Sequence, residues 1–380
     1  MQIKKILVAN RSEIAIRVFR AANELGIETV AIWAEEDKYA LHRFKADESY
    51  QIGRGPHLER DLGPIESYLS IDEVIRVAKL SGADAIHPGY GLLSESPEFA
   101  DACAANGIVF IGPKPETMRK LGNKVAARNL AIEIGVPVIP ATDPLPDDME
   151  AVKKLALEVG YPLMLKASWG GGGRGMRVIR SETELAKEVT EGKREAKAAF
   201  GKDEVYLEKL IERARHVEVQ VLGDTHGNAV HLFERDCSIQ RRNQKVVERA
   251  PAPYLSSELR EELCGYALRI ADATAYIGAG TVEFLQDADT GKFYFIEVNP
   301  RIQVEHTVTE QVTGIDIVKA QIHILEGAAI GTPESGVPSQ EHIRLNGHAL
   351  QCRITTEDPE QNFIPDYGRI TAYRGATGFG

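Results

Sequence analysis

The sequence predicts an α/β fold, and the patterns of three segments carry that prediction. Residues 5–33 have the pattern of a strand, a helix and a second strand. Residues 162–179 contain two apolar runs on either side of a glycine-rich turn, and residues 280–299 contain two strand-like runs around an acidic turn. At 380 residues the chain is long enough for two or three domains, each with a packed core.

The first segment predicts a Rossmann-like domain. An apolar run over residues 5–9 precedes a predicted helix over residues 14–25, and a second apolar run over residues 29–33 follows Gly26. A dinucleotide-binding domain would carry its glycine fingerprint in the first turn, but residues 10–13 contain no glycine. We therefore expect a Rossmann-like domain without a dinucleotide site.

Glycine and proline interrupt the segments that follow. Within residues 83–91 and 107–113 they mark predicted strand ends, where ligand-facing loops lie in open α/β sheets. Closely spaced prolines between residues 135 and 147 predict the boundary of a small inserted domain, which would end near residue 210.

The glycine-rich turn of the inserted domain predicts a flap that covers phosphate groups. Residues 170–175 match G-x-G-x-x-G, which is a weak signal in a run of glycines, and residues 176–179 look like a returning strand instead of a helix. Glycine N–H groups can approach a phosphate closely, and Lys166 on the preceding strand would add a positive charge. A flexible linker is the alternative. No G-x-x-x-x-G-K-[ST] motif occurs, which excludes a P-loop fold.

The acidic hairpin predicts a metal site. Folding residues 280–299 about Thr290 would set Glu283 opposite Glu297, with their Cβ atoms about 5 Å apart. Like charges at that distance repel unless a cation lies between them, and oxygen ligands favour Mg²⁺ or Mn²⁺. A shift of the register by one residue would separate the two carboxylates.

A row of alternating polar residues extends from this hairpin. It consists of Glu297, Asn299, Arg301, Gln303 and Glu305, with an apolar residue or proline after each of the first four. The alternation predicts a continuing strand with one chemically active face, because carboxylates and an amide suit a hard cation and an arginine suits an oxyanion. The solvated face of a half-buried strand is the alternative.

Charge limits the partners of the chain. The formal net charge of −11 disfavours nonspecific binding to nucleic acid or to anionic membranes, so an anion must meet a local basic site. Residues 235–245 form a basic cluster of this kind. A pocket for small anions and a solvated loop are its two interpretations, because neither interleaved aromatic residues nor an extended basic stripe accompanies it.

The cysteines and the N-terminal residues predict a cytoplasmic protein. The four cysteines lie far apart and form no Cys-x-x-Cys pair, which indicates neither zinc nor a disulfide framework. The apolar run that follows Lys5 is too short for a secretory or transmembrane segment.

Six motifs follow one another along essentially the whole chain: ANRSEIA at 9–15, HPGYGLLSE at 87–95, KASWGGGGRGM at 166–176, ERAPAP at 248–253, EVNPRIQVEH at 297–306 and CRI at 352–354. Together they resemble the biotin carboxylase domain of biotin-dependent carboxylases, a member of the ATP-grasp superfamily. Residues 168–169, 301–311 and 351–358 look most like the pyruvate carboxylase branch.

The resemblance implies an ATP-grasp fold with four parts. These are a Rossmann-like N-terminal domain over residues 1–115, a helical connector over 116–137, a mobile glycine-rich lid over 138–210, and an α+β region over 211–380 with the metal and bicarbonate site. The family's last domain normally continues for tens of residues, so we expect this region to be incomplete.

The resemblance also implies a reaction, in which MgATP phosphorylates bicarbonate to carboxyphosphate and the N1 nitrogen of biotin captures the CO₂. The residues implied to bind ATP are Lys124, Lys166, Gly171, Gly172, Gly173, Glu208, Lys209, Leu210, Ile211, His216 and Gln240. Those implied to bind bicarbonate are Lys245, Arg301, Gln303, Val304 and Glu305. The implied ligands of Mg²⁺ or Mn²⁺ are Glu283, Glu297 and Asn299. The implied catalytic residues are Arg301, Lys245, Glu305 as the base for bicarbonate, and Arg353 as the group that binds biotin and stabilises its enolate.

Partners outside the chain are implied as well. No Met-Lys-Met attachment motif occurs, so biotin would arrive in trans, either free or on a biotinyl carrier domain. A carboxyltransferase domain would pass the carboxyl group on, and in the pyruvate carboxylase branch this feeds oxaloacetate synthesis. We expect a homo-oligomer that binds neither nucleic acid nor membrane. Asn243, where histidine is common, and Ser12, where glycine is frequent, depart from the family pattern.

Two other functions stay open. A different ATP-grasp ligase would share the flap and the acidic hairpin but would not need Arg353 or the segment 301–305. A catalytically silent nucleotide-binding module is the second alternative.

Overall fold

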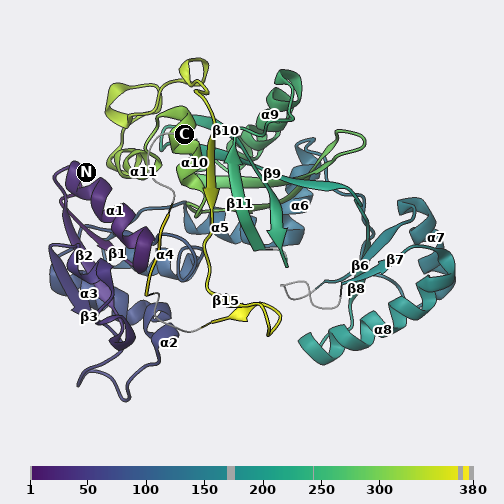
Figure 1. The fold of residues 1–380 in the computed structure, drawn as a ribbon, viewed down its shortest axis with the longest axis horizontal. Helices are drawn as coiled ribbons and strands as arrows, with labels where there is room; N and C mark the ends of the chain where they lie inside the picture. Colours follow the sequence, from purple (N-terminus) through teal and green to yellow (C-terminus); the bar gives the residue numbers. More distant parts are fainter. Residues whose placement is uncertain (1, 169–175, 243, 367–370, 376–380) are drawn as a thin grey trace.

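Three larger sheets and one short hairpin organise the described part of the chain. The computed structural model describes residues 2–168, 176–242, 244–366 and 371–375. The N-terminal domain lies beside the largest sheet, and the inserted subdomain extends from that sheet on the other side (Figure 1). Every helix among the described residues is too short or too polar to span a bilayer.

The N-terminal sheet is parallel throughout, with the strand order β3-β2-β1-β4-β5. Its strands are β1 (Lys5–Val8), β2 (Glu28–Trp33), β3 (Glu48–Gln51), β4 (Ala85–His87) and β5 (Val109–Phe110). Its helices are α1 (Ser12–Glu24), α2 (Pro64–Leu69), α3 (Ile71–Ser81) and α4 (Pro97–Ala105), with the short turns η1 (Glu35–Asp37) and η2 (Leu41–Phe44). The predicted Rossmann-like opening is confirmed, because β1, α1 and β2 form a parallel β-α-β unit.

The inserted subdomain has a small antiparallel sheet with the strand order β7-β6-β8. Its elements are α7 (Met149–Val159), β6 (Leu163–Ala167), β7 (Arg177–Ile179), α8 (Glu182–Phe200) and β8 (Val205–Lys209). Pairing of Leu163 with Ile179 confirms the predicted hairpin. The glycines proposed to form its tip, Gly171 to Gly173, lie outside the described residues.

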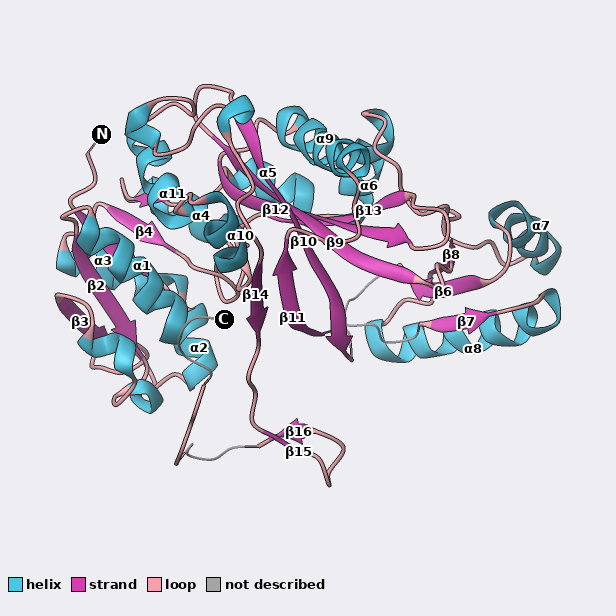
Figure 2. Cartoon of the chain, turned by 45° about the horizontal axis from the view of Figure 1, so that its top comes forward, coloured by secondary structure: helices cyan, strands magenta, loops and turns pink. Residues whose placement is uncertain are grey.

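The largest sheet has the strand order β13-β12-β9-β10-β11-β14 and is antiparallel throughout (Figure 2). Its strands are β9 (Ala214–Gly223), β10 (Ala229–Arg241), β11 (Gln244–Ala250), β12 (Gly278–Asp287), β13 (Phe293–Asn299) and β14 (Ala349–Cys352). The helices around it are α5 (Pro115–Gly122), α6 (Lys124–Glu133), α9 (Ser257–Ala273), α10 (His306–Thr313) and α11 (Ile317–Glu326). The turns η3 (Pro333–Ser335) and η4 (Gln340–His342) and the hairpin of β15 (Glu357–Asp358) with β16 (Ile364–Pro365) complete the described elements.

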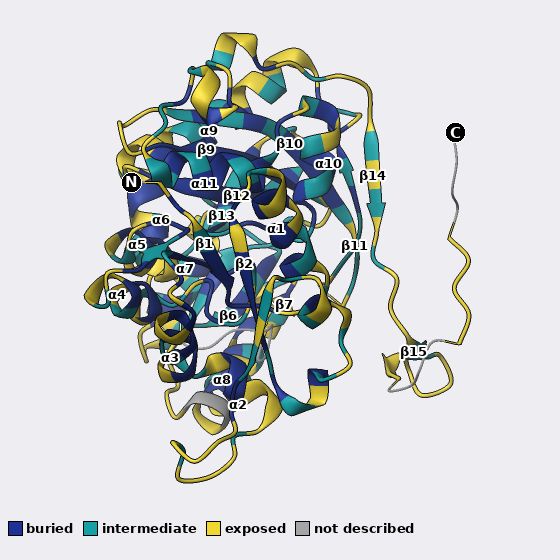
Figure 3. Cartoon of the chain, turned by 90° about the vertical axis from the view of Figure 1, so that its left-hand side faces the viewer, coloured by how far each residue is buried: buried dark blue, intermediate teal, exposed yellow. Residues whose placement is uncertain are grey.

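A shared hydrophobic core joins the N-terminal domain to the largest sheet. Ile6 of β1 and Val18 of α1 belong to the same buried cluster as Ile322 of α11 and Leu222 of β9. The inserted subdomain instead has a core of its own, built around Leu163. Buried residues fill the body of the molecule, whereas the segment after β14 is largely exposed and projects from it (Figure 3).

The strand predicted through residues 297–305 is wrong beyond its first three residues. Strand β13 ends at Asn299, and α10 begins at His306. Pro300 has no N–H for a sheet ladder, and the N–H of Arg301 turns back to the carbonyl of Asn299 at 2.8 Å. The segment that carries Arg301, Gln303 and Glu305 is therefore a turn at the end of the sheet.

Candidate active site on the largest sheet

A row of charged residues crosses four neighbouring strands of the largest sheet. In register, Arg235 of β10 pairs with Glu218 of β9, Glu218 pairs with Glu283 of β12, and Glu283 pairs with Glu297 of β13. The predicted opposition of Glu283 and Glu297 is thereby confirmed. Since directly paired residues point to the same face of a sheet, one face carries an arginine and three carboxylates side by side.

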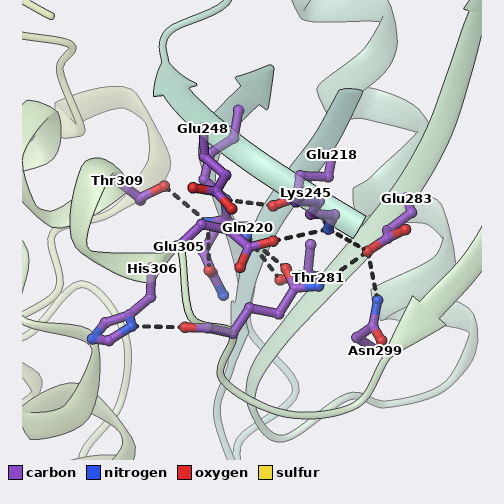
Figure 4. A network of polar contacts seen from close by, with 12 residues as sticks. Glu218, Gln220, Lys245, Glu248, Thr281, Glu283, Asn299, Glu305, His306 and Thr309 are labelled. Carbon is purple, nitrogen blue, oxygen red and sulfur yellow. Dashed lines mark hydrogen bonds and ion pairs between the residues drawn. The ribbon is translucent and has the colours of Figure 1, made fainter. Parts of the chain in front are cut away.

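Lys245 of β11 neutralises much of this acidic row. Its Nζ donates to Oε2 of Glu218 at 2.5 Å, to Oε1 of Glu283 at 2.8 Å and to Oε1 of Glu305 at 2.8 Å (Figure 4). The lysine side chain is 13% exposed and the three carboxylates are buried. A buried charge is stable only when it is paired and hydrogen-bonded, and here the one ammonium group satisfies three carboxylates.

Mutual attraction shifts the pKa values in this cluster. Burial would lower the pKa of Lys245, but the charges of Glu218, Glu283 and Glu305 outweigh burial and raise it. Burial would raise the pKa of Glu218, but Lys245 and Arg235 outweigh it and hold that pKa at about 2. The pKa of Glu283 is lowered against burial by His216 and Lys245. Glu218 and Glu283 are therefore ionised at neutral pH.

The turn after β13 adds two guanidinium groups to this edge of the sheet. Arg301 is bonded through Nε to Glu95 of the N-terminal domain and through Nη2 to Oδ1 of Asn299 at 3.1 Å. Arg353 donates through Nη2 to Oε2 of Glu305 at 2.9 Å, and its Nε donates to the buried Glu248. Glu305 thus lies between Lys245 and Arg353.

Lys245, Glu305 and the two arginines line one cavity of about 850 Å³. The largest sheet and the turn after β13 supply most of its lining, and Tyr90 and Gly91, which follow β4, supply the N-terminal domain's part. The predicted site residues in the lining are His216, Gln240, Lys245, Glu283, Glu297, Asn299, Arg301, Gln303, Val304, Glu305 and Arg353. The residues implied to bind bicarbonate, metal and biotin therefore converge on this cavity. Two of the residues implied to bind ATP, His216 and Gln240, line it as well.

The cavity wall fits a hard divalent cation. Glu283 and Glu297 lie opposite one another. Asn299 donates from Nδ2 to Glu283 at 2.8 Å, so its amide would have to turn over before its oxygen could face a cation beside Glu283. Carboxylate and amide oxygens are the ligands that Mg²⁺ prefers. Ligand atoms of His216, Glu218 and Glu283 also lie within 4.8 Å of one another, but Lys245 already bridges the two carboxylates. Glu297 is paired with the exposed Lys124 instead of Lys245, so Glu283 and Glu297 are the pair that could hold a cation.

Other residues implied to bind ATP lie outside this lining. Lys166 on β6 forms an ion pair with Glu208 on β8, inside the inserted subdomain. The ammonium group of Lys209 donates to the backbone carbonyls of Gly160 and Tyr161. The N–H of Leu210 donates to the carbonyl of Pro162, and Ile211 directly follows it in the chain.

One predicted ATP-binding lysine is exposed and contacts the cavity wall. Lys124, at the start of α6, has its Nζ 3.2 Å from Oε2 of Glu297 and a side chain that is 73% exposed. It thereby contacts one carboxylate of the cavity wall.

Comparison with known proteins identifies the family of this chain. Residues 2–118 match the family model described as "Biotin carboxylase, N-terminal domain", and residues 123–332 match "Carbamoyl-phosphate synthase L chain, ATP binding domain". The chain belongs to the biotin carboxylase family. A pyruvate carboxylase of Staphylococcus aureus is 56% identical over 379 residues, which cover 100% of this chain and 32% of that protein.

Solved structures of biotin carboxylase domains have the same fold. The Rhizobium etli pyruvate carboxylase with the allosteric activator acetyl coenzyme-A is 84% identical with a TM-score of 0.90, over 100% of this chain and 33% of that one. The biotin carboxylase domain of the Hydrogenobacter thermophilus 2-oxoglutarate carboxylase, solved with MgADP, ADP and bicarbonate, is 47% identical with a TM-score of 0.87, over 100% and 81%. This chain thus spans about a third of the pyruvate carboxylases it matches.

The sequence prediction missed three buried residues of this biotin carboxylase domain. Glu218, Arg235 and Glu248 are each 0% exposed, and each binds a predicted site residue. Alternation of polar and apolar residues over 216–221 was a signal for Glu218. Arg235 was hidden in the basic cluster over 235–245, which is not a solvated loop, because most of it belongs to strands β10 and β11.

Proposed function

We propose that this chain catalyses the ATP-dependent carboxylation of biotin with bicarbonate, through carboxyphosphate. The observation that supports it best is that the carboxylates of Glu283, Glu297 and Glu305 and the guanidinium groups of Arg301 and Arg353 all line one cavity. Phosphoryl transfer depends on positioning and charge neutralisation more than on covalent catalysis, and such a wall provides both.

In the first step, bicarbonate would bind beside Lys245 and Arg301, with Gln303 and the Val304 backbone as further donors. Glu305 would remove its proton, since its carboxylate lies at the same wall between Lys245 and Arg353. The bicarbonate oxygen then attacks the γ-phosphorus of ATP, and ADP leaves. Mg²⁺ or Mn²⁺ held by Glu283, Glu297 and Asn299 would neutralise phosphate charge during this transfer.

In the second step, carboxyphosphate would break down to CO₂ and phosphate, and the phosphate would take the N1 proton of biotin. N1 would then attack CO₂ while Arg353 holds the ureido oxygen. The guanidinium group is fixed from behind by the buried Glu248, which leaves it facing the cavity. A fixed donor of this kind stabilises a developing negative charge without reorganisation during the reaction.

The nucleotide would extend from the cavity to the inserted subdomain. His216 and Gln240 line the cavity, and Lys124, Lys166, the flap glycines and residues 208–211 would complete the ATP site. Carboxyphosphate hydrolyses readily, so the subdomain over residues 138–210 would act as the cover that keeps water out.

The remaining parts of the overall reaction would lie outside this chain. Biotin would be supplied in trans, either free or on a carrier domain, and a carboxyltransferase domain would pass the carboxyl group to pyruvate to form oxaloacetate. We also propose that the protein forms a homo-oligomer. We place it in the cytoplasm, which agrees with four free cysteines.

Release of ADP tests this function directly. Bicarbonate and free biotin are added separately and together, and ADP and carboxylated biotin are measured. We expect ADP release that requires bicarbonate, and carboxylated biotin only when both are present. Release that is independent of bicarbonate would point to a different ligase, and no release at all would favour the silent module.

Replacing Arg353 with alanine separates nucleotide chemistry from biotin chemistry. We expect Arg353→Ala to reduce biotin carboxylation about a hundredfold or more while ATP binding stays unchanged, because one preorganised charged donor contributes on that scale. Arg344→Ala, which removes an exposed arginine, is the matched control and should retain activity. Equal loss of nucleotide binding and carboxylation in Arg353→Ala would refute the assigned role.

A further inference from the structure

Arg235 uses every one of its N–H donors inside the protein. Its side chain is 0% exposed, and it projects from the middle of β10. The five hydrogen bonds go to five different side chains: Nε to Glu218 at 2.6 Å, Nη1 to Gln220 at 2.8 Å and to Thr309 at 3.0 Å, and Nη2 to Thr281 at 3.1 Å and to Gln303 at 2.9 Å. A guanidinium group has five N–H donors, so its donor capacity is filled.

These partners come from separate parts of the fold. Glu218 and Gln220 belong to β9, Thr281 to β12 and Thr309 to α10, whereas Gln303 belongs to the irregular turn after β13. Arg235 therefore fastens the turn that carries the proposed bicarbonate site to the rigid sheet beneath it.

The chemistry of its neighbours fixes the orientation of the Gln303 amide. A guanidinium group can only donate, so the amide atom that faces Arg235 must be the oxygen, Oε1. The amide nitrogen then faces Glu283 and donates to its Oε1 at 3.0 Å. An ionised carboxylate can only accept, so this second contact requires the same orientation.

This orientation has a consequence for anion binding. The amide nitrogen carries two N–H groups, and among the contacts of the described residues Glu283 accepts one of them. Gln303 lines the cavity, so the other N–H is available to an anion there. A flipped amide would present its oxygen to the anion and repel it.

We propose that Arg235 is a positioning residue for bicarbonate, which acts by holding the Gln303 amide with its N–H side toward the cavity. The inference rests on the proposed function and deepens it. Burial would lower the pKa of Arg235, but Glu218 and Glu305 outweigh burial and raise it, so the guanidinium stays charged and remains a donor only.

The conservative variant Arg235→Lys tests this role, because lysine keeps the positive charge but offers three donors from a single nitrogen. The measurement is bicarbonate-dependent ADP release by the intact protein. We expect the KM for bicarbonate to rise about tenfold to a hundredfold, because losing a hydrogen bond to a charged group has an effect of that size. The KM for ATP should change by less than about twofold. A parallel rise of both KM values would indicate a merely structural role and would overturn the proposal.

A second substitution shows whether Arg235 acts through Gln303. In a Gln303→Ala background the amide is already lost, so adding Arg235→Lys should change the KM for bicarbonate by less than about twofold. Full effects of both substitutions in the double variant would overturn the proposal. An unmodified protein without bicarbonate dependence would instead contradict the proposed function, which keeps the two failures distinct.

Two threonines keep the test decisive if Arg235→Lys does not fold. Thr281→Val removes an acceptor from Nη2, the nitrogen that also holds Gln303, whereas Thr309→Val removes one from Nη1, which does not touch Gln303. We expect Thr281→Val to raise the KM for bicarbonate about threefold and Thr309→Val to leave it unchanged. Equal effects of the two substitutions would overturn the proposal.

Discussion

Two clusters in this chain each surround one cation with three glutamates, and burial distinguishes them. Lys245 binds Glu218, Glu283 and Glu305, whose side chains are 0% to 8% exposed. Arg177 of the inserted subdomain binds three glutamates of α8 whose side chains are 19% to 47% exposed: Glu188, Glu191 and Glu195. The same charges thus occur once inside the protein and once near solvent.

The two clusters also differ in how the fold assembles them. The partners of Lys245 come from β9, from β12 and from the turn before α10, which are far apart in the sequence. The partners of Arg177 share one helix at positions i, i+3 and i+7, so that a single helical face presents them to β7. The first cluster requires the complete fold, whereas the second needs only a strand and a helix. We therefore expect the buried cluster to respond strongly to substitution and the exposed cluster to respond weakly.

The largest effect is expected from Lys245→Met, which keeps the length of the side chain and removes its charge. Three buried carboxylates would lose their shared partner, and breaking a buried ion pair costs about 3–5 kcal/mol of unfolding free energy. Urea unfolding measures the loss, and bicarbonate-dependent ADP release should fall below detection. Lys292→Met, at an exposed turn, is the matched control and should change stability by less than about 0.5 kcal/mol.

A second substitution sharpens this prediction. Adding Glu283→Gln to Lys245→Met removes one of the carboxylate charges that lost the lysine, so part of the lost stability should return. Stability of Lys245→Met equal to that of the unmodified protein would show that the buried charges do not depend on one another.

An intermediate effect is expected from acid. The pKa of Glu218 is held at about 2 in the folded protein, below its ordinary value of 4.5, so its contribution to stability is complete above pH 4.5. That contribution is lost as the pH falls from 4.5 toward 2, and by linkage it amounts to roughly 3 kcal/mol. Urea unfolding between these pH values measures the slope.

Glu218→Gln should flatten this acid slope, because the variant cannot take up the proton. Glu195→Gln, in the exposed cluster, should leave the slope as it is, since solvent and salt screen its ion pair. Equal slopes in the unmodified protein and in Glu218→Gln would contradict the role given to burial.

The sequence carried enough information to predict the acidic hairpin but not the buried network beneath it. Hairpin register depends on local turn chemistry and alternation, which is why Glu283 and Glu297 could be paired in advance. The contacts of Arg235 and Glu248 depend on which distant strands become neighbours, and no local pattern contains that information. The predicted strand through residues 300–305 was wrong because the alternation continues past Pro300 although the sheet ladder does not.

The smallest effect is expected from Arg177→Met, which tests the exposed side of the comparison. Each ion pair of Arg177 lies near solvent, so removing the charge should cost about 1 kcal/mol or less, and the methionine retains most of the apolar stem. The cost should shrink further at high salt, which screens exposed charges, while Lys245→Met should be almost insensitive to salt. Urea unfolding of both variants at low and high salt makes this measurement. A loss of about 3 kcal/mol or more for Arg177→Met would be as large as the loss expected for Lys245→Met and would contradict the comparison. The number of charges, and not their burial, would then determine how much each cluster contributes to stability.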